Sequence, residues 1–120
     1  MTSISSATTA WSLLLVAGLL EIVWASSMKA SEGFTKHPFT SITFIAAGLS
    51  FWLLGMAMKS LPLGTAYAVW TGIGAVGAAI LGMVLFKEPA TAGRIVCICA
   101  IVGGILGLKL LHRAGSGTGV

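Results

Sequence analysis

Four long apolar runs fill most of this 120-residue chain, and they limit its fold more than any other feature. The runs span residues 10–28, 38–58, 61–86 and 90–108. A helix needs about 20 mostly apolar residues to cross about 30 Å of hydrocarbon. The runs are continuously apolar rather than alternating, which favours helices over the strands of a barrel. We therefore predict an all-α membrane protein with four transmembrane helices.

Short polar joints at residues 29–37, 59–60 and 87–89 separate the runs. Such brief connections make neighbouring helices antiparallel, so we expect an up-down-up-down bundle. The chain then divides into an N-terminal segment (1–9), a four-helix transmembrane domain (10–111) and a flexible C-terminal tail (112–120). The first nine residues contain no Lys or Arg, and a signal peptide needs a positive n-region. We expect the first run to be a retained helix.

Composition excludes several other classes of protein. Apolar residues make up 57% of the chain and charged residues 8%, whereas a soluble domain is about 25% charged. The two cysteines, Cys97 and Cys99, cannot form a disulfide scaffold, and no His or third Cys accompanies them as a metal ligand. The basic residues form no stripe that would bind nucleic acid. No nucleophile-base pair, metal cluster or phosphate loop is present, so we expect neither an enzyme nor a cofactor.

The basic residues divide almost evenly between the two predicted sides of the membrane. Three lie on the side of the chain termini and four on the other: Lys59, Lys109 and Arg113 against Lys29, Lys36, Lys87 and Arg94. This difference gives almost no positive-inside bias. Either one residue fixes the topology, or the chain inserts in both orientations and pairs antiparallel.

Glu21 lies inside the first apolar run and is the only acid in any run. A charged side chain at bilayer depth costs about 3 kcal/mol or more. Glu21 must therefore be protonated, face a wet cavity or pair with a cation. We interpret it as a proton and cation site. The alternative is a permanently protonated Glu21 that is hydrogen-bonded to a neighbouring helix.

Several polar or aromatic side chains are candidates for the surroundings of Glu21. Trp24 lies one helical turn further on the same face and brings an indole N–H donor. Tyr67 and Trp70, three residues apart, share a face of the third run and suit a cation beside a carboxylate. Ser50 bonds either its own i−4 carbonyl, as lone serines in membrane helices commonly do, or Glu21.

Glycines mark two further features. Residues 72–77 match the dinucleotide pattern G-x-G-x-x-G by letter, but no strand precedes them and they lie in an apolar helix. Gly72 and Gly74 are instead candidates for close packing and for a bend. In the fourth run, Gly103 and Gly107 have the Gly-x-x-x-Gly spacing of a helix-association face.

One acid in four short helices suggests transport by a pair of chains. Two copies would bring two Glu21 carboxylates to one chamber, as inverted repeats do in larger transporters. Two close carboxylates titrate as a coupled pair and need neutralisation by protons or by a cation. If the two are mutually exclusive and only the neutralised pair switches sides, the result is proton-coupled antiport.

The chain resembles the small multidrug resistance family over nearly all of residues 11–111. The motifs are Glu21, Ser50-Phe-Trp-Leu-Leu54, Leu61-Pro-Leu-Gly-Thr-Ala-Tyr-Ala-Val-Trp-Thr-Gly-Ile-Gly74 and Phe86-Lys-Glu-Pro89. The resemblance implies an antiparallel, dual-topology homodimer in a bacterial inner membrane that exchanges protons for cations. It also implies that Glu21 is the shared ligand and that the third helix bends near Gly72 and Gly74.

Within that family, the chain is similar to the guanidinium-exporter branch because of Trp24, the stretch from Gly64 to Gly72 and the Lys-Glu-Pro joint. This likeness implies that Trp24, Ser50, Tyr67 and Trp70 form a shell around Glu21. The tail after Lys109 is longer than in typical members. Three alternatives remain: an exporter of quaternary ammonium compounds, an accessory membrane subunit without transport, and one half of a heterodimer.

Overall fold

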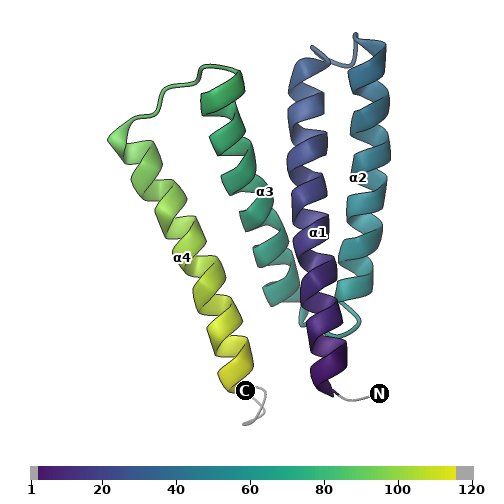
Figure 1. Cartoon of the computed structure of the whole chain (residues 1–120), viewed down its shortest axis with the longest axis vertical. Helices are drawn as coiled ribbons and strands as arrows, with labels where there is room; N and C mark the ends of the chain where they lie inside the picture. The colour runs from purple at the N-terminus through teal and green to yellow at the C-terminus, as the bar shows by residue number, and fades with distance from the viewer. Residues whose placement is uncertain (1–2, 116–120) are drawn as a thin grey trace.

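The computed structural model describes the backbone of residues 3–115 and the side chains of residues 8–111. It has the helices α1 (Ser3–Ala30), α2 (His37–Ala57), α3 (Leu63–Leu85) and α4 (Ala92–Gly115), as shown in Figure 1. Each contains a stretch long and apolar enough to cross a membrane: Thr8–Ala30, His37–Ala57, Leu63–Leu85 and Ala92–Leu111. The predicted all-α class with four transmembrane helices is confirmed.

The first and last helices extend beyond the predicted apolar runs. Helix α1 begins at Ser3, so it includes most of the predicted N-terminal segment. A hydroxyl near a helix start can be satisfied inside the helix, as Ser12 shows by donating to the carbonyl of Thr8 (2.9 Å). Helix α4 continues to Gly115, and the rest of the predicted tail, residues 116–120, lies outside the described residues.

The corner between α1 and α2 is a tight polar turn. Glu32, Gly33 and Phe34 have positive φ angles of 49°, 75° and 68°. Ser31 fixes this turn because its hydroxyl donates to the carbonyl of Met28 (2.7 Å) and accepts from the backbone N–H of Phe34 (3.0 Å). Helix α2 then begins with a proline in its first turn, where the missing N–H is tolerated.

The corner between α3 and α4 is held by both backbone and side chains. The backbone N–H groups of Phe86 and Glu88 both donate to the carbonyl of Gly82 (3.1 and 3.0 Å). The Glu88 side chain lies against Gly82, where a Cβ would overlap its carboxylate. Arg94, in the first turn of α4, pairs with Glu88 at 3.1 Å. The start of α4 is thereby tied to the end of α3.

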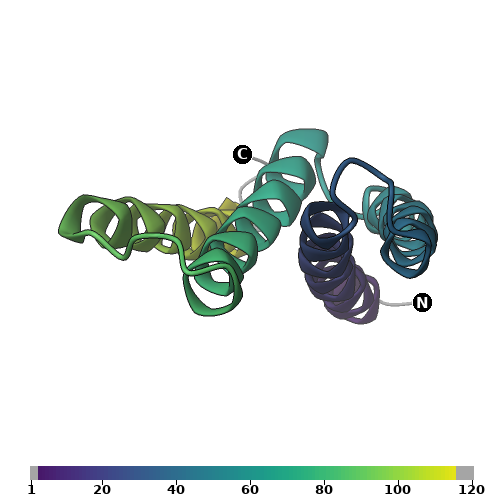
Figure 2. The ribbon, with the colours of Figure 1, turned by 90° about the horizontal axis from the view of Figure 1, so that it is seen from above.

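The helices form a flat row in the order α2, α1, α3, α4 (Figure 2). Helices that follow one another along the chain run antiparallel (Figure 1). The molecule measures 49 × 34 × 17 Å. The predicted antiparallel succession is confirmed, but the row is not the closed bundle that we expected. Helix α4 packs its backbone against α3 alone, and none of its described side chains (residues 92–111) is buried.

The apolar core lies at the end of the molecule that holds both chain termini. Its buried members come from the first half of α1, the end of α2, the connection before α3 and the first half of α3: Ala10, Leu14, Ala17, Leu54, Ala57, Leu61, Ala66, Val69 and Trp70. At the opposite end α1 and α3 diverge (Figure 1). At that end of α1 the buried side chains are polar, Ser27 (9% exposed) and, directly after the helix, Ser31 (0%), and they do not belong to the apolar core.

Candidate functional site

Glu21 projects from α1 onto the backbone of α3. Its position is about 13 Å along the helix axis from the end of α1 at Ala30, well inside the membrane-spanning part. A Cβ placed on Gly74 would overlap the Glu21 carboxyl group, so any other residue there would displace the carboxyl group from this position. The sequence marked Gly74 as a bend and gave no signal that it touches Glu21.

Two buried polar atoms on the Glu21 face of α1 have no hydrogen-bond partner among the described residues. They are Oε1 of Glu21 and Nε1 of Trp24, an acceptor and a donor one helical turn apart. An unpaired buried polar group costs about 1–3 kcal/mol. A permanently protonated Glu21 would need a hydrogen bond to a neighbouring helix. Oε1 of Glu21 makes no such bond within the described part of the chain. Trp24 lies one helical turn from Glu21 and its ring contacts Phe51, and its predicted part in the shell around Glu21 stays a prediction.

Ser50 links three helices rather than making either of its predicted bonds. Its hydroxyl donates to the carbonyl of Ala17 in α1 (2.7 Å) and accepts from Nε1 of Trp70 in α3 (3.0 Å). Ser50 is fully buried and Trp70 is 5% exposed. Both predictions, a bond to its own i−4 carbonyl and a bond to Glu21, are wrong for this structure. The reason is that α1 approaches α2 closely enough for the hydroxyl to reach the Ala17 carbonyl across the helix interface.

A chain of aromatic rings runs from Trp24 to Tyr67. The ring centroids of Trp24 and Phe51 are 6.1 Å apart, those of Phe51 and Trp70 are 5.6 Å apart, and those of Trp70 and Tyr67 are 5.5 Å apart. The predicted common face of Tyr67 and Trp70 is confirmed. Phe51 is an addition, and its only signal in the sequence was its place directly after Ser50.

Glycines allow the helices to approach closely around the site. A Cβ on Gly18 would lie 2.7 Å from Ile73 Cγ2, and one on Gly72 would lie 2.7 Å from Ile105 Cδ1. The predicted close packing at Gly72 and Gly74 is confirmed. Helix α3 is helical throughout Leu63–Leu85, so the bend at these glycines stays a prediction.

The Gly-x-x-x-Gly face of α4 is open within a single chain. A Cβ on Gly103 or Gly107 would meet nothing within 4 Å. The predicted association role therefore stays a prediction that concerns another copy or another protein. Cys97 and Cys99 are exposed thiols, and no group of three or more metal-ligating side chains occurs among the described residues.

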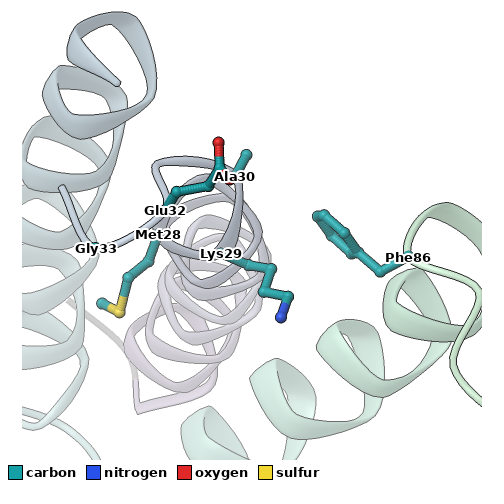
Figure 3. A pocket seen from close by; sticks show the side chains of 6 residues that line it. All are labelled: Met28, Lys29, Ala30, Glu32, Gly33 and Phe86. Carbon is teal, nitrogen blue, oxygen red and sulfur yellow. The ribbon is translucent and has the colours of Figure 1, made fainter. Parts of the chain in front are cut away.

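A cavity of about 560 Å³ lies at the diverging end of α1 and α3, away from Glu21. Figure 3 shows its lining, in which Lys29 extends from the end of α1 toward Phe86 at the end of α3. Met28, Ala30, Glu32 and Gly33 complete the lining.

Comparison with known proteins places this arrangement in a family. The sequence model described as Small Multidrug Resistance protein matches residues 9–101, which include Glu21, Ser50, Trp70 and Gly74. The chain belongs to the small multidrug resistance family. Together with the four spans, this membership makes it a multi-pass protein of the bacterial inner membrane, as the sequence predicted.

Three similar members of the small multidrug resistance family carry the same name, "Guanidinium exporter". A "Guanidinium exporter" of Yersinia pseudotuberculosis is 56% identical over 101 residues, which cover 84% of this chain and 97% of that protein. "Guanidinium exporter" proteins of Salmonella typhimurium and Citrobacter freundii are each 54% identical over 100 residues, covering 83% of this chain and 95% of theirs. The predicted family and branch are therefore confirmed at the level of sequence.

Proposed function

We propose that this protein is a proton-coupled antiporter that exports guanidinium or small guanidinyl cations, with Glu21 as the shared ligand for proton and cation. The observation that carries the proposal is the buried, unpartnered carboxylate oxygen of Glu21 inside a membrane-spanning helix. At this depth a proton or a cation must neutralise that group, since the lysine and arginine side chains within the spans, Lys29, Arg94 and Lys109, lie near the span ends. The name shared by the relatives supplies the substrate class.

The chemistry of the site suits a planar cation. Guanidinium is always charged at neutral pH and its N–H groups match a carboxylate in a bidentate way. Trp24, Phe51, Trp70 and Tyr67 offer ring faces that attract a cation. The Ser50 hydroxyl fixes the Trp70 indole, so the wall beside the carboxylate keeps its shape.

We propose that the working unit is an antiparallel, dual-topology homodimer. The flat row encloses no passage of its own, and Phe51, Trp52 and Tyr67 are 52%, 62% and 52% exposed in the single chain. A second copy would cover these aromatic side chains and bring a second Glu21 to the same chamber. Gly103 and Gly107 then supply the association face on α4.

Exchange follows from competition for the two carboxylates. Two nearby carboxylates cannot both remain ionised without compensation, so protons or a cation must occupy them. If the dimer switches sides only when neutralised, protons entering along their gradient drive the cation outward. A bend of α3 at Gly72 and Gly74, next to the Glu21 carboxyl group, would couple occupancy to the switch.

The test is transport in liposomes that contain only this chain. Guanidinium added outside should produce a proton flux, measured as a change of internal pH. Glu21→Gln should abolish that flux. Glu32→Gln is the matched control, because Glu32 is exposed in the α1–α2 corner and should leave the flux unchanged.

Each alternative predicts a different result in the same assay. An exporter of quaternary ammonium compounds would prefer a bulky aromatic cation over guanidinium in direct competition. An accessory subunit, or one half of a heterodimer, would give no flux from this chain alone. Equal flux from the native protein and Glu21→Gln would refute the mechanism.

A further inference from the structure

A second cavity, of about 460 Å³, lies between α1, α3 and α4 on a different side of α1 from the Glu21 carboxyl group. Its walls are apolar, with Leu15 and Ile22 from α1, Ile73 from α3 and Leu106 from α4. The one charged side chain in the lining is Lys109. We propose that this groove binds an acyl chain of an anionic phospholipid and that Lys109 holds the lipid phosphate.

The groove has the length of one bilayer leaflet. Its lining on α1 begins at Trp11 and ends at Ile22, a rise of about 16 Å. Half of the roughly 30 Å hydrocarbon core is a similar distance. Trp11 lies near the start of the span Thr8–Ala30, so the groove runs from one membrane surface to the middle of the bilayer.

The charge stands where a lipid headgroup would be. Lys109 lies near the end of the span Ala92–Leu111, and its Nζ is 5.5 Å from the centroid of the Trp11 ring. Tryptophan and lysine are both favoured at the headgroup level of a membrane. A lysine ammonium at that depth, above an apolar groove, complements a phosphate whose acyl chain enters the groove.

The groove is open toward lipid and separate from the face that we assign to a second copy. Leu15 and Leu106, on its walls, are 52% and 56% exposed. On α4, Leu106 and Lys109 each lie within about 40° of Val102 around the helix axis. Gly103 and Gly107 lie about 100° and 140° around the helix from Val102. A partner seated on the glycines would therefore lie beside the Leu106 edge of the groove, on the side away from Lys109.

The proposal is tested by native mass spectrometry of the full protein released from detergent with defined lipids. The probes are phosphatidylglycerol and phosphatidylcholine with identical acyl chains, and glycerol 3-phosphate as a headgroup without chains. The native protein should retain at least fivefold more phosphatidylglycerol than phosphatidylcholine, and glycerol 3-phosphate should not displace it.

Three variants separate the parts of the site. Lys109→Ala should lower the retention of phosphatidylglycerol to that of phosphatidylcholine. Lys59→Ala removes an exposed lysine from the connection between α2 and α3, which Figure 1 shows at the same end of the molecule as the end of α4. Lys59 does not line the groove, so this variant should change nothing. Leu106→Trp fills the groove and should lower the retention of both lipids.

Four results would overturn the proposal. Equal retention of the two lipids by the native protein would show that the headgroup is not recognised. Equal effects of Lys59→Ala and Lys109→Ala would show that the preference for phosphatidylglycerol depends on net charge and not on Lys109. Displacement by glycerol 3-phosphate would indicate a site for phosphate alone. Loss of dimers in Leu106→Trp, with lipid retention unchanged, would show that a second copy covers the groove. If Leu106→Trp fails to fold, the two lysine variants still decide.

Discussion

Ser50→Ala is the substitution whose effect on stability the structure defines most closely. Ser50 is fully buried and holds the carbonyl of Ala17 at 2.7 Å and the indole of Trp70 at 3.0 Å. Alanine keeps the small volume and the helical backbone, so the loss is confined to these two hydrogen bonds.

The expected cost follows from what each partner loses. The Ala17 carbonyl keeps its bond within α1, whereas the Trp70 indole N–H is left without a partner in an apolar setting. Interhelical hydrogen bonds in membrane proteins contribute about 0.6 kcal/mol on average and up to about 1.7. A stranded buried donor costs about 1–3 kcal/mol. We expect Ser50→Ala to lower the free energy of unfolding by about 1–2 kcal/mol.

This change in the free energy of unfolding is measured in mixed micelles. The protein is unfolded by increasing mole fractions of dodecyl sulfate, and unfolding is monitored by far-ultraviolet circular dichroism. Ser12→Ala is the matched control, because Ser12 bonds only the Thr8 carbonyl of its own helix at an exposed site. The double variant Ser50→Ala with Trp70→Phe should cost less than the sum of the two single variants, since the second change removes the stranded donor. Strict additivity, or a Ser50→Ala effect no larger than that of Ser12→Ala, would refute the tether.

Three other outcomes follow from the same contacts. Gly74→Ala places a methyl group where the Glu21 carboxyl lies, so guanidinium-driven proton flux in liposomes should fall about tenfold or more, whereas Gly48→Ala, which meets nothing within 4 Å, should leave it unchanged. Trp24→Phe keeps a ring near Phe51 but removes the buried indole donor, so the Kd for guanidinium should rise about tenfold with the rest of the fold intact, as binding of labelled guanidinium would measure. In the α1–α2 corner, the ion pair between Glu32 and Lys36 (2.8 Å) lowers the pKa of Glu32 and raises the pKa of Lys36. The contribution of this pair to stability is therefore present at neutral pH, and it is lost as the pH falls through the lowered pKa of Glu32 or rises through the raised pKa of Lys36. Carboxyl NMR should show the titration midpoint of Glu32 returning upward in Lys36→Met.

The sequence correctly predicted the features that depend on the periodicity of a single helix. Continuous apolar runs predicted four spanning helices, and one-turn spacing predicted that Trp24 shares the Glu21 face and that Tyr67 shares a face with Trp70. These relations depend only on 3.6 residues per turn, which hardly varies between proteins. They therefore need no knowledge of the neighbouring helix.

Relations between helices could not be read in the same way. Ser50 bonds the Ala17 carbonyl because α1 and α2 approach in one register, and no spacing within α2 specifies that register. The contact of Glu21 with Gly74 and the tilted contact between the rings of Phe51 and Trp70 depend on the same offsets between helices. The flat row was also unforeseen, because every helix is apolar on all sides and the sequence does not say which sides meet within one chain.

The thinness of the molecule also bears on genetics. A slab 17 Å thick supplies only one wall of the chamber, so in the proposed pair every side chain that faces the substrate occurs twice. A defective allele would then act on intact copies as well, since random assembly places an altered subunit in most pairs when both are made equally. Export in such a merodiploid cell should fall well below half of normal, which is the inheritance pattern of dominant interference rather than of simple loss.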